Sequence, residues 1–149
     1  MNEQDTQHKT NTIDGLQLGG ARPGDVVVRP GLLSVKETID KLEAFLKQQG
    51  ITVYGRINQQ QELEKVGLVL RPLEFLLFGN PKAGGLVMQE NPLAAIALPL
   101  KVIAWEDADK KVWIGYYSGD GMATEFGISA KAAGPLHVGA LIDKVFTTP

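Results

Sequence analysis

The stretch from Ser34 to Gly50, SVKETIDKLEAFLKQQG, carries the signals of a complete helix, including both of its ends. Ser34 and Glu37 have the spacing of a capping box, in which a hydroxyl and a carboxylate each accept a backbone N–H. Apolar residues then recur along one helical face, at Val35, Ile39, Leu42 and Leu46. Gly50 stands where a residue with positive φ commonly ends a helix. The stretch therefore predicts an amphipathic helix over about Val35–Gln49.

Strands are predicted on both sides of this helix. Three consecutive valines favour a strand at Asp25–Arg29, and alternation of apolar and polar residues favours another at Ile51–Ile57. Leu73–Phe78 is a third, largely apolar strand. Leu100–Trp105 and Val112–Tyr117 are joined by a short polar segment, which predicts a hairpin.

The connections hold shorter elements. A helix is predicted at Gln59–Val66, capped by Asn58 and ended by Gly67, and a loop at Gly79–Gly85. Helical turns follow at Leu86–Glu90 and from Asn91-Pro92 to Ile96. A turn is predicted at Ser118–Gly121 and a final helix from about Pro135. The order β-α-β-α-β-α-β-β-α predicts an α+β fold. We expect a two-layer sandwich, with a mainly antiparallel sheet of four to five strands and helices on one face. Residues 1–22 are expected to be a flexible tail and residues 23–149 a single domain.

Composition excludes several classes of function. The 15 Lys and Arg residues are scattered among 17 acids, which argues against a nucleic-acid surface. The chain has no cysteine, so disulfides, thiolate metal sites and cysteine nucleophiles are excluded, and we expect neither a metal nor a cofactor. No apolar stretch approaches the length that crosses a bilayer, and the N-terminus is polar. We therefore expect a cytoplasmic protein without membrane association, although a chain that begins after a cleaved signal peptide would look the same.

Two motifs resemble known sites only superficially. Gly79–Gly85 is spaced like a phosphate-binding P-loop, but glycine replaces the required lysine at position 85 and no Ser or Thr follows. A glycine-rich loop can still direct backbone amides at an anion, and the alternative is a plain connection. The acidic cluster at Glu106, Asp107 and Asp109 fits a polar hairpin turn better than a calcium loop. His137 has no spaced partner that would suggest a catalytic triad.

The segment Phe78-Gly79-Asn80-Pro81-Lys82 resembles the core motif of an uncharacterised bacterial-type family, domain of unknown function 302. Further similar segments are Ser34–Leu42, Gly67–Pro72, Leu98–Val102, Trp105–Asp107 and Val112–Tyr116, so that the resemblance covers about Val26–Ile128. It implies a two-layer α+β fold related to that of the TATA-binding protein, and it implies homodimers. It does not imply DNA binding, because a shared fold does not carry function. The activity of the family is not established.

This chain departs from the family pattern at three positions. The family usually has a histidine where Asn58 stands, an aspartate where Ala97 stands and a second histidine where Phe126 stands. All three differences remove a titratable group, and an asparagine cannot act as a base near neutral pH. Acid–base chemistry is therefore disfavoured in this member.

Our leading hypothesis is a non-catalytic module that binds a small, anionic ligand. The segments Phe78–Gly85 and Leu98–Lys101 are expected to lie side by side and to line a pocket, with Lys82 or Lys101 at its mouth. The alternative is that both segments are only rigid turns over the core. The candidate ligand-binding residues are Asn80, Lys82, Lys101, Glu106, Tyr116 and Asn58.

Two further hypotheses belong to other classes of function. The chain could be a homodimeric structural or interaction protein that associates through a sheet edge or through the aromatic hairpin of Trp105, Trp113, Tyr116 and Tyr117. It could also be an enzyme that uses Glu106 or Tyr116 as an acid or base. The enzyme ranks last because no pairing of a nucleophile with a base is visible.

Overall fold

The computed structural model describes residues 12–13, 16–17 and 25–147. Five strands form one antiparallel sheet in the order β3-β7-β6-β5-β4. Their bounds are Val26–Pro30 (β3), Thr52–Asn58 (β4), Leu73–Gly79 (β5), Leu100–Glu106 (β6) and Val112–Tyr117 (β7). The predicted α+β class and the antiparallel sheet are confirmed.

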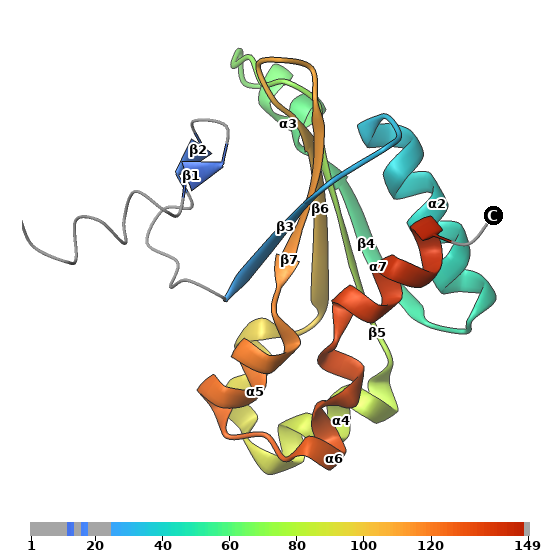
Figure 1. Cartoon of the computed structure of the whole chain (residues 1–149), viewed down its shortest axis with the longest axis vertical. Helices are drawn as coiled ribbons and strands as arrows, with labels where there is room; N and C mark the ends of the chain where they lie inside the picture. The colour runs from blue at the N-terminus through green and yellow to red at the C-terminus, as the bar shows by residue number, and fades with distance from the viewer. Residues whose placement is uncertain (1–11, 14–15, 18–24, 148–149) are drawn as a thin grey trace, which may run out of the picture.

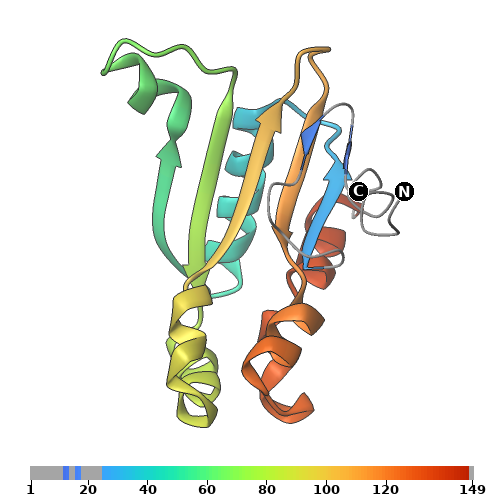
Figure 2. The same ribbon diagram turned by 90° about the vertical axis from the view of Figure 1, so that its left-hand side faces the viewer.

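Helices cover one face of the sheet and close its two ends (Figures 1 and 2). Two of them, α2 and α7, lie on the same face, while α4, α5 and α6 gather at one end and α3 lies at the other. The bounds are Val35–Gln48 (α2), Gln59–Glu64 (α3), Pro81–Glu90 (α4), Pro92–Ala97 (η1, a 3₁₀ helix), Gly119–Phe126 (α5), Ala130–Ala133 (α6), Gly134–Leu136 (η2, 3₁₀) and Val138–Thr147 (α7). The arrangement is a sandwich of one sheet and one helical layer.

The predicted signals of α2 are all present. The Ser34 hydroxyl accepts the Glu37 N–H at 3.1 Å, and the Glu37 carboxylate accepts the Ser34 N–H at 3.2 Å. Gly50 has φ +71°, which glycine adopts without strain. The apolar stripe is buried against the sheet, since none of Val35, Ile39, Leu42 and Leu46 is more than 3% exposed.

The two faces of the sheet differ in burial. Along β5, Glu74, Leu76 and Phe78 are buried on the face that carries α2, whereas the residues between them are only half-buried. The same alternation runs through β6, where Leu100, Val102 and Ala104 are buried. The core therefore lies between the sheet and the α2–α7 layer.

Two predictions of irregular structure were wrong. Gly79–Gly85 is not a loop, because α4 begins at Pro81 with the Asn80 side chain as its N-cap. Asn80-Pro81 is the same start signal as Asn91-Pro92, and cap and proline outweigh the roughly 1 kcal/mol that each helical glycine costs. Ser118–Gly121 is likewise not a turn but the start of α5, with the Ser118 hydroxyl accepting the Gly121 N–H at 3.1 Å.

Side-chain hydrogen bonds connect the helices at the end of the sheet where α4, α5 and α6 gather. The Glu90 carboxylate, at the end of α4, accepts the backbone N–H and the hydroxyl of Ser129 at 2.8 and 2.7 Å. The Asn91 amide donates to the Phe126 carbonyl at 2.9 Å. These contacts fix α4 and η1 against α5 and α6.

The N-terminal prediction falls almost wholly outside the described residues. Within residues 1–22 only two short strands are described, β1 at Thr12–Ile13 and β2 at Leu16–Gln17, and they pair antiparallel. The expected tail and its boundary with the domain therefore stay predictions.

Candidate functional site

A cavity of about 620 Å³ opens where the sheet meets the C-terminal end of α2 and the starts of α4 and α7. Cavities of this size are typical of small-molecule sites in proteins. The wall is mainly apolar, and its larger apolar side chains are Phe45, Ile51, Phe78, Val87, Met88, Leu98, Leu100, Leu136, Val138 and Leu141. The cavity therefore suits a largely apolar molecule.

A few polar groups stand in this apolar wall. They are contributed by Gln49, Tyr54, Asn80, His137 and Lys144. Lys144 brings a positive charge from α7, and the His137 ring lies 3.8 Å from the carboxylate of Asp120. None of the described residues that line the cavity is an aspartate or a glutamate. The polar part of the wall thus favours neutral or negatively charged groups over cations.

The two segments predicted to meet do lie side by side. Residues 78–81 and 83–84 line the cavity together with Leu98, Pro99 and Leu100, and Phe78 pairs directly with Leu100 between β5 and β6. Neither predicted lysine is among the lining residues. Lys82 is exposed on α4, while Lys101 points to the opposite face of the sheet, its ammonium 4.6 Å from the centre of the Phe75 ring.

Asn80 is the predicted residue that does line the cavity. Its side-chain oxygen accepts the N–H groups of Lys82 and Ala83 at 3.0 and 3.3 Å. This oxygen satisfies two of the amides that the first turn of α4 would otherwise leave open. The start of α4 is therefore capped by the chain itself at the wall of the cavity.

The two helical glycines of α4 differ in their relation to the cavity. Gly84 lines it, and a Cβ atom built there would sit 3.8 Å from Leu98 Cδ1, an ordinary contact. Gly85 does not line it, and a Cβ atom there would meet nothing within 4 Å. A larger side chain at position 84 would thus enter the cavity, whereas one at position 85 would not.

The remaining predicted site residues lie elsewhere. Tyr116 is buried on β7, where its hydroxyl accepts from the Arg29 guanidinium at 3.4 Å. Glu106 ends β6 at the hairpin, and the Asn58 side chain caps α3 by accepting the Gln61 N–H at 3.1 Å. Asn58 and Glu106 belong to the end of the sheet opposite the cavity, because Phe78 and Leu100 pair at the cavity end. Their roles in ligand binding stay predictions.

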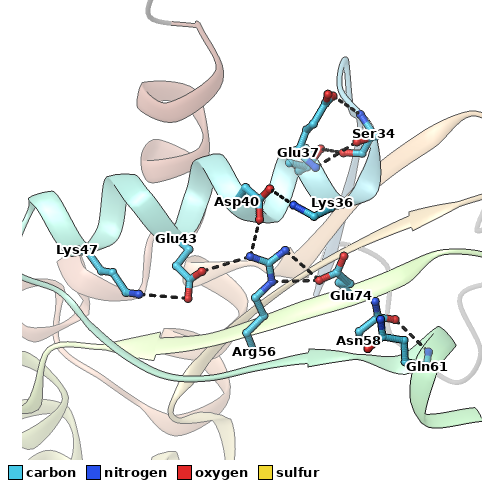
Figure 3. Close-up of polar contacts among 11 residues, drawn as sticks. Ser34, Lys36, Glu37, Asp40, Glu43, Lys47, Arg56, Asn58, Gln61 and Glu74 are labelled. Carbon is cyan, nitrogen blue, oxygen red and sulfur yellow. Dashed lines mark hydrogen bonds and ion pairs between the residues drawn. The ribbon is translucent and has the colours of Figure 1, made fainter. Parts of the chain in front are cut away.

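A charged cluster between α2, β4 and β5 is a second arrangement of titratable groups (Figure 3). The Arg56 guanidinium on β4 binds Asp40 at 2.7 Å, Glu43 at 3.2 Å and Glu74 at 3.0 Å. Burial lowers the pKa of Arg56, but its hydrogen bonds to Asp40 and Glu74 outweigh that effect and raise it. Every carboxylate here already faces the guanidinium, so the cluster fastens α2 to β4 and β5.

The three departures from the family pattern do not form one site. Asn58 lies at the α3 end of the sheet, whereas Ala97 ends η1 and Phe126 ends α5 at the other end. Within residues 25–147 and the two short strands before them, no group of three or more His, Asp or Glu side chains is placed to hold a metal ion.

Sequence reasoning missed the far wall of the cavity. Phe45 comes from the last turn of α2 and Gln49 is its C-cap residue, while Leu141 and Lys144 come from α7 and His137 joins η2 to α7. The one local signal was Phe45, an apolar residue beside the buried stripe of α2. The rest depends on how α7 returns to the sheet, which no local pattern encodes.

Comparison with known proteins identifies the family. The sequence profile described as "Domain of unknown function DUF302" matches residues 27–145, so the chain belongs to the DUF302 family. The fold agrees with a crystal structure of an uncharacterized conserved DUF302 protein from Bacillus stearothermophilus, with a TM-score of 0.63 and 24% identity over 82% of this chain and 92% of that one. At this identity the likeness shows the fold alone. The relation to the TATA-binding protein fold stays a prediction.

Curated relatives contain a similar segment within longer proteins. The chain is 38% identical over 81 residues, or 54% of its length, to "Fluoride-specific ion channel FluC 1" from Brucella suis and to the proteins named FluC 1 in Brucella abortus and FluC 2 in Brucella melitensis. The match spans only 30–32% of those proteins. In the described part of this chain, no helix has both the length and the apolarity to cross a bilayer.

Proposed function

We propose that this chain is a non-catalytic module that binds a small, mainly apolar ligand with an acidic or polar end in the cavity beside α4. The observation that carries the proposal is the lining: a broad apolar wall with Lys144 and His137 and without a carboxylate among the described lining residues. Such a wall gains free energy from apolar surface, and the cationic side chain orients an acidic head. Sugar phosphates and nucleotides, with little apolar surface, fit this wall less well than a medium-chain carboxylate.

The test uses decanoate as the probe and two matched variants of α4. Gly84→Leu places a side chain in the cavity and should weaken decanoate binding at least tenfold, as measured by calorimetry. Gly85→Leu adds the same side chain to the same helix outside the cavity and should leave the affinity unchanged. Equal effects of the two substitutions, or no decanoate binding by the wild type, would contradict the proposal.

A second measurement tests whether the cavity prefers a ligand with an acidic end. Decanol offers the same alkyl chain without the charge, so decanoate should bind more tightly, and Lys144→Gln should reduce this preference. If decanol bound as well as decanoate, the cavity would be an apolar site without preference for an acid.

A second candidate function is self-association, which the family resemblance also implies. It is favoured by the second face of the sheet, which is apolar but only half-buried. Light scattering at tens of micromolar, a range in which weak dimers form, should give twice the chain mass of 16.1 kDa. A monomer mass throughout this range would exclude the candidate.

A further inference from the structure

The face of the sheet that turns away from α2 is apolar across all five strands. One row of directly paired residues runs Ile57, Phe75, Ile103, Gly115 and Val28, and the next runs Leu73, Trp105, Trp113 and Pro30. Leu77 and Val26 extend the surface toward the cavity end. We call these eleven residues the open face.

Among the described elements, the short strands β1 and β2 lie on the side of the open face, near β3 and β7 (Figures 1 and 2), and the rest of the open face is not covered by a helix or strand. Apart from the exposed Pro30, its side chains are half-buried, while Leu76, Val102 and Ala104, which lie between them on the α2 face, are fully buried. In both views α2 and α7 lie on the other side of the sheet (Figures 1 and 2). An antiparallel sheet with one solvated face ordinarily carries polar residues there, whereas most positions on this face are apolar, with Lys101 and Tyr117 as polar residues in the row of Leu77 and Val26. Apolar patches of this kind mark binding surfaces.

Close packing makes the open face flat at its centre. A Cβ atom at Gly115 would lie 3.1 Å from Trp105 and 3.2 Å from Ile103, so both side chains close over the glycine. The one charged residue among the strand positions on this side is Lys101, whose ammonium rests over the Phe75 ring at 4.6 Å. This cation–π contact lets the lysine stem cover apolar surface while the charge stays at the margin.

We propose that the open face binds the open face of a second copy of this chain, so that two sheets stack between two helical layers. This inference rests on the second candidate function, self-association, and names its surface. Stacked sheets pack about 10 Å apart through interdigitating apolar side chains. A second copy supplies the same flat apolar surface, and Lys101, the one charged residue among the strand positions on this side, already holds its ammonium over the Phe75 ring.

The size of the open face agrees with this occupant. With strands about 4.8 Å apart and residues about 3.3 Å apart, the five strands span a flat area of roughly 500 Å² before side-chain relief is counted. Standard interfaces bury about 800 Å² per partner, which is of the same order. An anionic membrane surface is a poorer match, because it attracts clustered Lys and Arg, and this face has one lysine.

The sheet edges are less suited to pairing with another copy. On β3 the strand ends at Pro30, which lacks an N–H, and β4 has a register shift between Val53 and Gly55. Prolines and bulges at edges oppose the addition of a further strand. Of the two predicted routes, a sheet edge or the aromatic hairpin, the geometry favours the hairpin together with the rest of the open face.

The decisive experiment compares charge on and off the open face by light scattering of the full chain. Ile103→Glu and Val28→Glu place a carboxylate in the central row, and each should weaken the dimer at least about 30-fold, as loss of a central interface residue does. Ile96→Glu, on η1 and 82% exposed, is the matched control and should remain a dimer. Far-UV circular dichroism verifies that each variant is folded, and the use of two strands keeps the test valid if one variant is not.

Intrinsic fluorescence gives an independent readout, because both tryptophans of the chain lie on the open face. Dilution of the wild type should shift their emission to longer wavelength as the dimer dissociates, and Ile103→Glu should show the shifted emission at every concentration. A wild type that is monomeric would overturn both self-association and this surface. A dimer that both open-face variants leave intact would overturn this surface while self-association stood.

Discussion

At the residue scale, the side chain of Asp107 holds the β6–β7 hairpin together. One carboxylate oxygen accepts the N–H groups of Asp109 and Lys111 at 2.8 and 3.0 Å, and the other accepts the Trp113 indole N–H at 2.8 Å. The hydrogen bond from Trp113, aided by those from the two backbone amides, lowers the pKa of Asp107 despite its burial. The acidic cluster seen in the sequence is therefore a turn built around one carboxylate.

This lowered pKa predicts how stability depends on pH. A carboxyl whose pKa is lower in the folded state stabilises the fold above its unfolded pKa, near 3.9, and loses that contribution as the pH falls through the folded value. Asp107→Asn should therefore be less stable than the wild type at pH 7 in urea unfolding, and the difference should shrink below about pH 4. Asp109→Asn, exposed at the same turn, should stay within about 0.5 kcal/mol of the wild type. A difference as large at pH 3 as at pH 7 would contradict the assignment.

At this scale, the sequence could predict only contacts between residues that are close together in the chain. The Ser34–Glu37 capping box and the Asn58 cap need only residues three apart, and both are present. The bond from Trp113 to Asp107 could not be predicted, because it requires the two strands of the hairpin to be in register first.

At the element scale, α4 shows how a correct signal was outweighed by a misleading composition. Asn80-Pro81 marks a helix start, but the glycines at positions 84 and 85 suggested a loop. Neither glycine has a positive φ, so nothing in the backbone requires glycine there. The cavity wall explains Gly84, since a side chain would occupy that space.

Gly85 and Gly50 should therefore respond in opposite ways to alanine. Gly85→Ala raises helix propensity and should increase the free energy of unfolding by up to about 1 kcal/mol. Gly50→Ala forces a Cβ atom into φ +71° and should decrease it by about 1 kcal/mol. Urea denaturation of both variants measures the two signs. A loss of stability in Gly85→Ala would contradict the argument from helix propensity.

At the scale of the whole molecule, the order of elements predicted the layers but not the cavity. Alternating strands and helices with a hairpin before the final helix led to an antiparallel sheet with one helical layer, and that is the fold. The cavity could be predicted only in part: Phe78 and Leu100 are neighbours on adjacent strands, but Phe45 and Leu141 reach it through tertiary packing of α2 and α7. The open face was likewise hidden, because a largely apolar run such as Leu73–Phe78 indicates that both faces of a strand are apolar but not which face the helices cover.

The cavity and the open face are separate parts of the molecule, since no residue of the open face lines the cavity. Substitutions at sites without shared partners commonly add within about 0.5 kcal/mol. We therefore expect the effects of Gly84→Leu and Ile103→Glu on the free energy of unfolding to sum in the double variant. Urea denaturation of the wild type, the two single variants and the double variant, all at one protein concentration, measures these free energies. Decanoate should also raise the melting temperature of Ile103→Glu as much as that of Ile96→Glu, because the ligand stabilises whichever folded form holds its cavity. An interaction energy above about 1 kcal/mol would instead show that contact between two copies reshapes the cavity through β4, β5 and β6, the three strands that contribute to both surfaces.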